Sequence, residues 1–286
     1  DYVHREFGSF YAREITPGSF VEVPGSGELI DQQVVINDDS VYSRKYDAIM
    51  ARFDYRLGSR WNFGVNYTWS EAKGNFDGET FDEGPIPGTF FEYQEYKEAR
   101  WNVPDGLLGI DQTHKFNGWV VWEAIATNRH NLSLSLLQTF ASGTPYSNVA
   151  SIDTVPYVGD PADLGYASNP GTQNYYFSKR GAFRTEDVTR TDLALNISFF
   201  IDAWGTQLEL FIQPEVVYVF NESAVVDPNT RTLSARNDSS LQTFNPFTET
   251  PVEGVHWRKG DSFGQPLSEE DYQQPRTFRF SVGIRF

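Results

Sequence analysis

The strongest catalytic motif in the sequence is a Gly-x-Ser-x-Gly segment. Gly260-Asp261-Ser262-Phe263-Gly264 matches the nucleophile elbow of serine hydrolases. That chemistry needs a strand, a strained turn and a helix that together present the serine oxygen. Here the motif lies in a long polar stretch without a helical pattern. We therefore interpret it as a chance match and expect no catalytic residue and no enzymatic activity.

Metal-ligating residue types are present without the spacing of a metal site. The four histidines are scattered along the chain: His4, His114, His130 and His256. None of them forms an i,i+4 pair or a similar ligand motif. Three acidic clusters, Asp38-Asp39, Glu79 to Glu83 and Glu269-Glu270-Asp271, could bind calcium through their carboxylates, although none has the spacing of an EF-hand loop. Solvated loop charge is the simpler interpretation, so we expect neither metal nor cofactor.

An aromatic-rich stretch near the end of the chain is the best candidate for ligand contact. Aromatic residues and arginine are common anchors of binding surfaces. The candidate ligand-contacting residues are Phe244, Phe247, His256, Trp257 and Arg258. The alternative is that these side chains pack on one another in an outer loop, and the sequence leaves both interpretations open.

The composition narrows the class of protein that must position these residues. The chain has 286 residues, a net charge of -16, no cysteine and 16% aromatic residues. Such a negative charge argues against a nucleic-acid partner. No run of eighteen apolar residues is present, so the sequence predicts no transmembrane helix. Many aromatics in a polar chain are typical of a membrane barrel, whose outer face alone is apolar.

Alternation with period two is the clearest structural signal. Between residues 61 and 70 every second residue is apolar and the others are polar or glycine. We expect the apolar row to face lipid: Trp61, Phe63, Val65, Tyr67 and Trp69. The last strand repeats the pattern with Phe278, Phe280, Val282, Ile284 and Phe286.

The whole chain reads as eight long antiparallel strands. We expect them at residues 2–13, 46–57, 61–73, 113–126, 131–142, 187–201, 206–220 and 276–286. Each reaches the roughly 9 to 11 residues that cross a bilayer. Tight turns alternate with four long polar loops at 14–45, 71–112, 143–186 and 221–275, and we expect no helix. This layout predicts an all-β transmembrane barrel segment with its short turns in the periplasm and its loops outside.

The other face of the predicted strands carries charge. Its charged residues include Arg52, Asp54, Arg190, Asp192, Glu209 and Glu215. In a barrel these side chains face the lumen, where they either contact a plug or line a channel, or else pair with one another.

Several short motifs, in their order and spacing, resemble Oar-like TonB-dependent receptors over nearly the whole chain. They are the strand from Tyr46 to Leu57 followed by Tyr67-Thr68-Trp69-Ser70, then Asp111-Gln112-Thr113-His114-Lys115-Phe116, Ser142-Gly143-Thr144-Pro145-Tyr146, Arg190-Thr191-Asp192-Leu193, Val219-Phe220-Asn221 and the terminal Phe286.

The resemblance implies an outer-membrane receptor whose barrel has about 22 strands. It also implies an N-terminal plug, a TonB-contacting segment and a final strand, Phe278 to Phe286, that the barrel-assembly machinery recognises. The plug and the TonB-contacting segment are not in this sequence. The expected partners are therefore outer-membrane lipid, the rest of the barrel with its plug, the TonB system and the assembly machinery.

Our leading interpretation is that residues 1–286 form the C-terminal part of such a barrel and cannot close a barrel alone. The strand at 276–286 should then pair with a strand from outside this sequence. One alternative is a self-contained eight-stranded barrel that acts as an adhesin or structural protein, in which 276–286 pairs with 2–13. A second alternative is a secreted, soluble β-sandwich that binds glycans.

Overall fold

The computed structural model describes residues 1–286 except 9, 38–41, 77–103, 168–170 and 204–205. Its main feature is one antiparallel sheet with the strand order β1-β4-β5-β7-β8-β13-β14-β17. These strands are β1 (Tyr2–Glu6), β4 (Arg44–Leu57), β5 (Trp61–Gly74), β7 (His114–Ala126), β8 (His130–Ala141), β13 (Val188–Ala203), β14 (Thr206–Val217) and β17 (Thr277–Arg285). The expectation of an all-β fold is confirmed.

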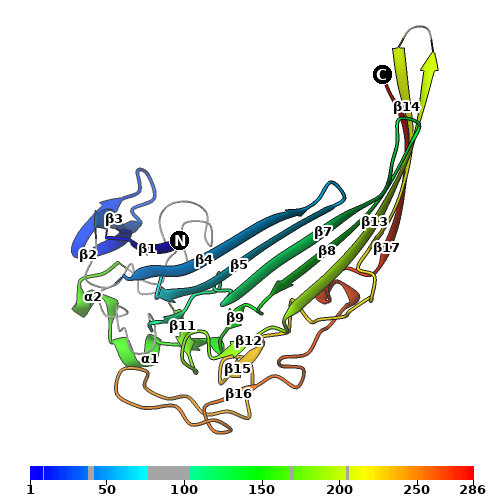
Figure 1. Ribbon diagram of the computed structural model, residues 1–286. Helices are drawn as coiled ribbons and strands as arrows, with labels where there is room; N and C mark the ends of the chain where they lie inside the picture. Colours follow the sequence, from blue (N-terminus) through cyan, green and yellow to red (C-terminus); the bar gives the residue numbers. More distant parts are fainter. Residues whose placement is uncertain (9, 38–41, 77–103, 168–170, 204–205) are drawn as a thin grey trace.

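The long strands run side by side from a group of loops to an end with short turns (Figure 1). The short β6 (Gly106–Leu107) adds to β5 at the loop end. At the opposite end Gly58, whose φ is +60°, makes the tight turn between β4 and β5. Such left-handed backbone suits glycine because it has no Cβ.

The first expected strand is wrong in its extent. β1 ends at Glu6, and the chain then leaves the sheet to form a separate hairpin of β2 (Tyr11–Glu22) with β3 (Leu29–Asn37). The cause is Phe10, which is buried against Tyr42 with ring centroids 5.9 Å apart. Burying that ring away from the sheet interrupts a pattern that alternation alone would continue.

The expectation of no helix is also wrong, although the helices are short. The described residues include α1 (Val155–Val158) and α2 (Pro161–Leu164), each of four residues, and a 3-10 turn η3 (Glu269–Asp271). Gly159, with φ +92°, ends α1, and Pro161 begins α2. A single helical turn is too short to show a 3.6-residue pattern. None of the helices in the described ranges is long and apolar enough to cross a membrane.

The two faces of the sheet differ sharply in chemistry. Cross-strand register places Phe53 opposite Val65 and Ile212 opposite Val282, so apolar rows continue from strand to strand. We call this the apolar face. Ion pairs lie on the other, polar face: Arg52–Asp54, Arg190–Asp192, Arg279–Glu215 and Arg285–Glu209. The charged side chains thus pair with one another, which is one of the alternatives that the sequence left open.

Glycines on the polar face receive large side chains from the neighbouring strand. Gly64 lies opposite Trp119, and a Cβ at Gly64 would come within 2.3 Å of the indole. Gly283 lies opposite Phe211 in the same way, with the contact at 2.7 Å. Each aromatic ring therefore covers a backbone position that a larger residue could occupy only if the ring moved or became smaller.

A loop layer of short paired strands covers the loop end of the sheet. Its pairs are β9 (Pro145–Tyr146) with β12 (Phe183–Arg184), β10 (Val149–Asp153) with β11 (Thr172–Tyr176), and β15 (Thr232–Ser234) with β16 (Trp257–Lys259). Its core contains Ile15, Ile152, Tyr166, Tyr175 and Phe244. The hairpin β2–β3 supplies Ile15, so three stretches distant in sequence, around residue 15, from 152 to 175 and around residue 244, share this core.

The main sheet is open in the described residues. β17 pairs with β14, β1 pairs with β4, and no ladder joins β17 to β1. The sheet therefore ends in two edges.

Candidate functional site

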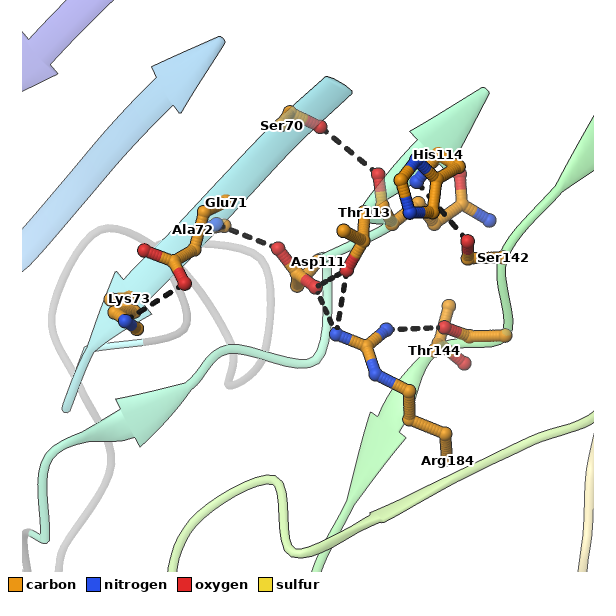
Figure 2. A network of polar contacts seen from close by, with 12 residues as sticks. Ser70, Glu71, Ala72, Lys73, Asp111, Thr113, His114, Ser142, Thr144 and Arg184 are labelled. Carbon is orange, nitrogen blue, oxygen red and sulfur yellow. Dashed lines mark hydrogen bonds and ion pairs between the residues drawn. The ribbon is translucent and has the colours of Figure 1, made fainter. Parts of the chain in front are cut away.

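An ion pair with a buried carboxylate holds the loop layer onto the sheet (Figure 2). The side chain of Asp111 is fully buried; its carboxylate accepts the backbone N–H of Ala72 at 2.7 Å and pairs with Arg184. Arg184 also donates to the hydroxyl of Thr113 at 3.0 Å and to the carbonyl of Gly143 at 2.7 Å. We call these five residues the polar clasp. It connects the end of β5, the start of β7, the end of β8 and β12.

The polar clasp unites two of the motifs that carry the family resemblance. Asp111 belongs to the Asp111 to Phe116 motif, and Gly143 belongs to the Ser142 to Tyr146 motif. A second contact joins them, because the hydroxyl of Ser142 accepts the backbone N–H of His114 at 3.1 Å. The sequence does not single out Arg184, whose partner Asp111 lies 73 residues away. No local pattern could have found it.

Three of the five candidate ligand-contacting residues fill the core of the loop layer. Phe244 is 5% exposed and meets Tyr175 edge to face, with ring centroids 5.2 Å apart. Trp257 is buried and stacks on Phe177 at 5.1 Å. Phe247 packs against the same cluster. Packing within the loop is thus the main role that the structure gives these rings.

Two cavities lie beside the remaining candidates. The first, which we call the His256 cavity, has a volume of about 240 Å³. Its lining includes Asp153, Arg236, Gln242, Thr243, Phe244 and His256. It gathers residues from β10, from the turn after β15 and from two later loops. Phe244 belongs to the core of the loop layer and also lines this cavity.

The second cavity, the Arg258 cavity, has a volume of about 590 Å³ and a more polar lining. Arg258 donates from Nε to Asp238 at 2.8 Å and from Nη1 to Asp261 at 3.0 Å. Two hydrogen bonds lower the pKa of Asp238 to about 2: the larger effect comes from the Ser240 hydroxyl and the next from Arg258. Arg258 is therefore committed to carboxylates of its own chain.

The Gly-x-Ser-x-Gly segment lies at the Arg258 cavity. Ser262 lines it, and no histidine is among the described residues of that lining. The segment is a turn after β16 that leads into further turns and not directly into an α-helix, so it lacks the elbow geometry that activates a serine.

The histidines and acidic clusters do not converge in the described ranges. Each histidine contacts a different residue: His4 with Asp47, His114 with Tyr67, His130 with Phe199 and His256 with Phe244. Asp271 caps η3 by accepting the backbone N–H groups of Leu267 and Ser268, which lowers its pKa. Asp38-Asp39 and Glu79 to Glu83 lie outside the described residues. Within the described part of the chain, no group of three such residues could hold a metal ion.

The two predicted apolar rows lie on one face of the sheet. On β5 the row comprises Trp61, Phe63, Val65, Tyr67 and Trp69, and Trp61 stacks on Trp122 of β7 with centroids 5.3 Å apart. On β17 and the residue after it, the row comprises Phe278, Phe280, Val282, Ile284 and Phe286, all at least 60% exposed. Contact with lipid and recognition by the assembly machinery stay predictions.

Comparison with known proteins gives one partial match. No family profile and no solved structure matches the chain. The chain is 27% identical over 151 residues to the TonB-dependent transporter Oar of Myxococcus xanthus. The match covers 50% of this chain and 13% of the transporter. It shows a distant relation of this chain to a TonB-dependent transporter.

Proposed function

We propose that residues 1–286 form part of the barrel wall of a TonB-dependent receptor in a bacterial outer membrane. The receptor takes up or handles a ligand and catalyses no reaction. The observation that carries the proposal is the apolar face, which no second layer covers in the described residues. The partial likeness to a TonB-dependent transporter supports the same assignment.

The exposure of the apolar face demands an apolar environment. Phe53 is 60% exposed, Leu57 52% and Val282 70%, and their rows continue across the sheet. A soluble sandwich would bury such rows against a second sheet. Monomeric soluble proteins rarely expose contiguous apolar patches larger than a few hundred Å². Lipid covers this face if the strands cross a bilayer, and the long strands of 12 to 16 residues exceed the required length.

The two open edges favour a wall segment over a small closed barrel. In hydrocarbon every unpaired backbone amide or carbonyl costs several kcal/mol, so an open sheet edge is untenable there. An eight-stranded barrel would need a ladder between β17 and β1, which the described residues lack. We propose that both edges pair with strands supplied from outside residues 1–286, and that a plug and the TonB system complete the receptor.

The layout supports one orientation in the membrane. The loop layer faces outside, where it meets ligand first, and the short turns face the periplasm. The final strand then ends on the periplasmic side, accessible to the barrel-assembly machinery.

Fractionation of cells that make the protein tests the membrane assignment. We expect the protein in the outer-membrane fraction, resistant to extraction by alkaline carbonate, and we expect its gel mobility to change on boiling, as folded barrels do. Recovery in the soluble fraction without detergent would favour the β-sandwich and overturn the proposal. TonB dependence is tested separately by co-purification of the receptor with TonB. This co-purification should be lost when an agent bound to the periplasmic side of the receptor prevents access of TonB.

A further inference from the structure

The His256 cavity places opposite charges beside an aromatic wall. Arg236 and Asp153 both line it, together with Phe244, which is also part of the core of the loop layer. Contact with Tyr175 and His256 fixes the Phe244 ring. Convergent polar groups around an apolar wall are the usual composition of a small-molecule site.

Arg236 is an unused cation. Its backbone N–H donates to Ser234, but its guanidinium has no partner among the described residues. The chain carries a net charge of -16, so a carboxylate partner would be easy to supply. Arg258, at the neighbouring cavity, has two such partners. A guanidinium left free at a cavity is suited to bind a ligand carboxylate through two parallel hydrogen bonds.

Asp153 offers the opposite charge. Its Oδ1 accepts the backbone N–H of Val155 at 3.1 Å at the start of α1, while Oδ2 has no partner in the described part of the chain. The cavity thus provides the Asp153 carboxylate as an acceptor for a cationic group, and the Arg236 guanidinium as a donor of two parallel hydrogen bonds. Together the two side chains match a ligand with an ammonium and a carboxylate.

His256 and its neighbours add neutral hydrogen-bonding groups. The Nδ1 atom of His256 accepts the backbone N–H of Val252 at 2.9 Å, so the ring hydrogen is on Nε2 in the neutral form. Three polar groups of the lining have no hydrogen-bond partner among the described residues: the Nε2–H of His256 and the side chains of Gln242 and Thr243. They can orient a ligand that the charges hold.

We propose that the His256 cavity binds a small zwitterion with an apolar body, such as a free aromatic or aliphatic amino acid. Its volume of about 240 Å³ is below the roughly 300 to 1,000 Å³ of sites for drug-sized molecules, which limits the ligand to this size. A zwitterion has no net charge, so the negative field of the protein does not repel it as it would repel a free acid. The carboxylate binds Arg236, the ammonium binds Asp153, and the body lies on Phe244.

This inference rests on the proposed receptor function, because it names the class of ligand that the receptor would bind. The binding itself needs neither a membrane nor TonB. Failure of the fractionation or TonB experiments therefore leaves the cavity proposal standing. Absence of binding to correctly inserted receptor leaves the membrane proposal standing.

Three probes with the same ring and chain length test the proposal by calorimetry on the purified protein in detergent. They are L-phenylalanine, 3-phenylpropionate, which lacks the ammonium, and 2-phenylethylamine, which lacks the carboxylate. We expect phenylalanine to bind and each analogue to bind at least about tenfold more weakly, because each loses one charge-assisted hydrogen-bonding group. No binding of phenylalanine at millimolar concentration, or equal binding of all three, would overturn the proposal.

Two substitutions test which side chain binds each charged group of the ligand. Arg236→Gln should weaken phenylalanine and 3-phenylpropionate by about tenfold and leave 2-phenylethylamine unchanged. Asp153→Asn, which keeps an oxygen for the N–H of Val155, should weaken phenylalanine and 2-phenylethylamine only. Arg231→Gln is the matched control, because Arg231 is an exposed arginine of the same layer that lines the other cavity. An equal effect of Arg231→Gln and Arg236→Gln would show a general charge effect and refute the site.

Discussion

A lysine in place of Val65 should destabilise the protein far more than a lysine in place of Asn66, its neighbour on the other face. Val65 lies on the apolar face between Phe53 and Gly118. It is four residues from Trp61 and four from Trp69, which at about 3.3 Å per residue is about 13 Å along the strand in each direction. With a tilt of about 40°, these distances become about 10 Å along the membrane normal, which places Val65 near the middle of an apolar band about 25 Å tall.

The magnitude follows from that depth. A lysine at the midplane of a barrel wall costs about 2 to 4 kcal/mol, equivalent to a factor of about 30 to 900 in the folding equilibrium constant. Asn66 lies on the polar face between Arg52 and Asn117. Its lysine variant stays in water and suffers mainly repulsion from Arg52, which costs about 1 kcal/mol or less.

Denaturant titration of the receptor folded in phospholipid vesicles measures both penalties from the shift in the unfolding midpoint. Val65→Met is the control, because methionine is unbranched like lysine and carries no charge. It separates the effect of charge from the loss of a β-branched residue. Penalties for Val65→Lys and Asn66→Lys that agree within about 0.5 kcal/mol would show that the apolar face does not contact lipid.

Three further outcomes are expected. Asp111→Asn removes the buried negative charge that pairs with Arg184 and should cost about 1 to 3 kcal/mol, seen as faster proteolysis of the loop layer while the strands stay protected; an unchanged cleavage rate would refute the role of the polar clasp. Because folding lowers the pKa of Asp238 from 3.8 to about 2, its stabilising contribution is complete above about pH 4 and is lost as the pH falls toward 2; the tryptophan fluorescence should follow this loss, and Asp238→Asn should remove this contribution while that of Asp271, whose pKa is also lowered, remains. Deletion of Phe286 should lower the amount of receptor assembled in the outer membrane, measured by surface labelling, whereas Phe286→Tyr should assemble normally; equal levels for both variants would remove the recognition role.

The sheet could be predicted because each strand carries its own signal. The alternation from Trp61 to Trp69 depends on one face being apolar and the other polar, and it is visible without knowledge of any neighbour. The predicted extent of the first strand was wrong because residues 2–13 contain parts of two strands. The burial of Phe10 against Tyr42 decides where the first of them ends. The two residues lie on either side of the β2–β3 hairpin, so no local pattern in the sequence shows their contact.

The candidate site was predictable only in part. The segment with Phe244 and His256 was singled out by its aromatic content, but the packing of Phe244 against Tyr175 depends on a strand about 70 residues earlier. Arg236 and Asp153 escaped notice because single charged residues in polar loops are common. Only the fold shows that both of them line one cavity.

The glycine and aromatic pairs on the polar face have a consequence for how related sequences can diverge. Gly64 and Trp119 fill one space jointly, as do Gly283 and Phe211. A larger residue at either glycine is tolerated only if the ring across the ladder becomes smaller. Among relatives we therefore expect positions 64 and 119 to covary in size, with the summed volume kept, and positions 211 and 283 to do the same. Such coupled substitutions would show in an alignment which residues pair across neighbouring strands. They would do so even where the identity between two receptors is too low to align individual loops.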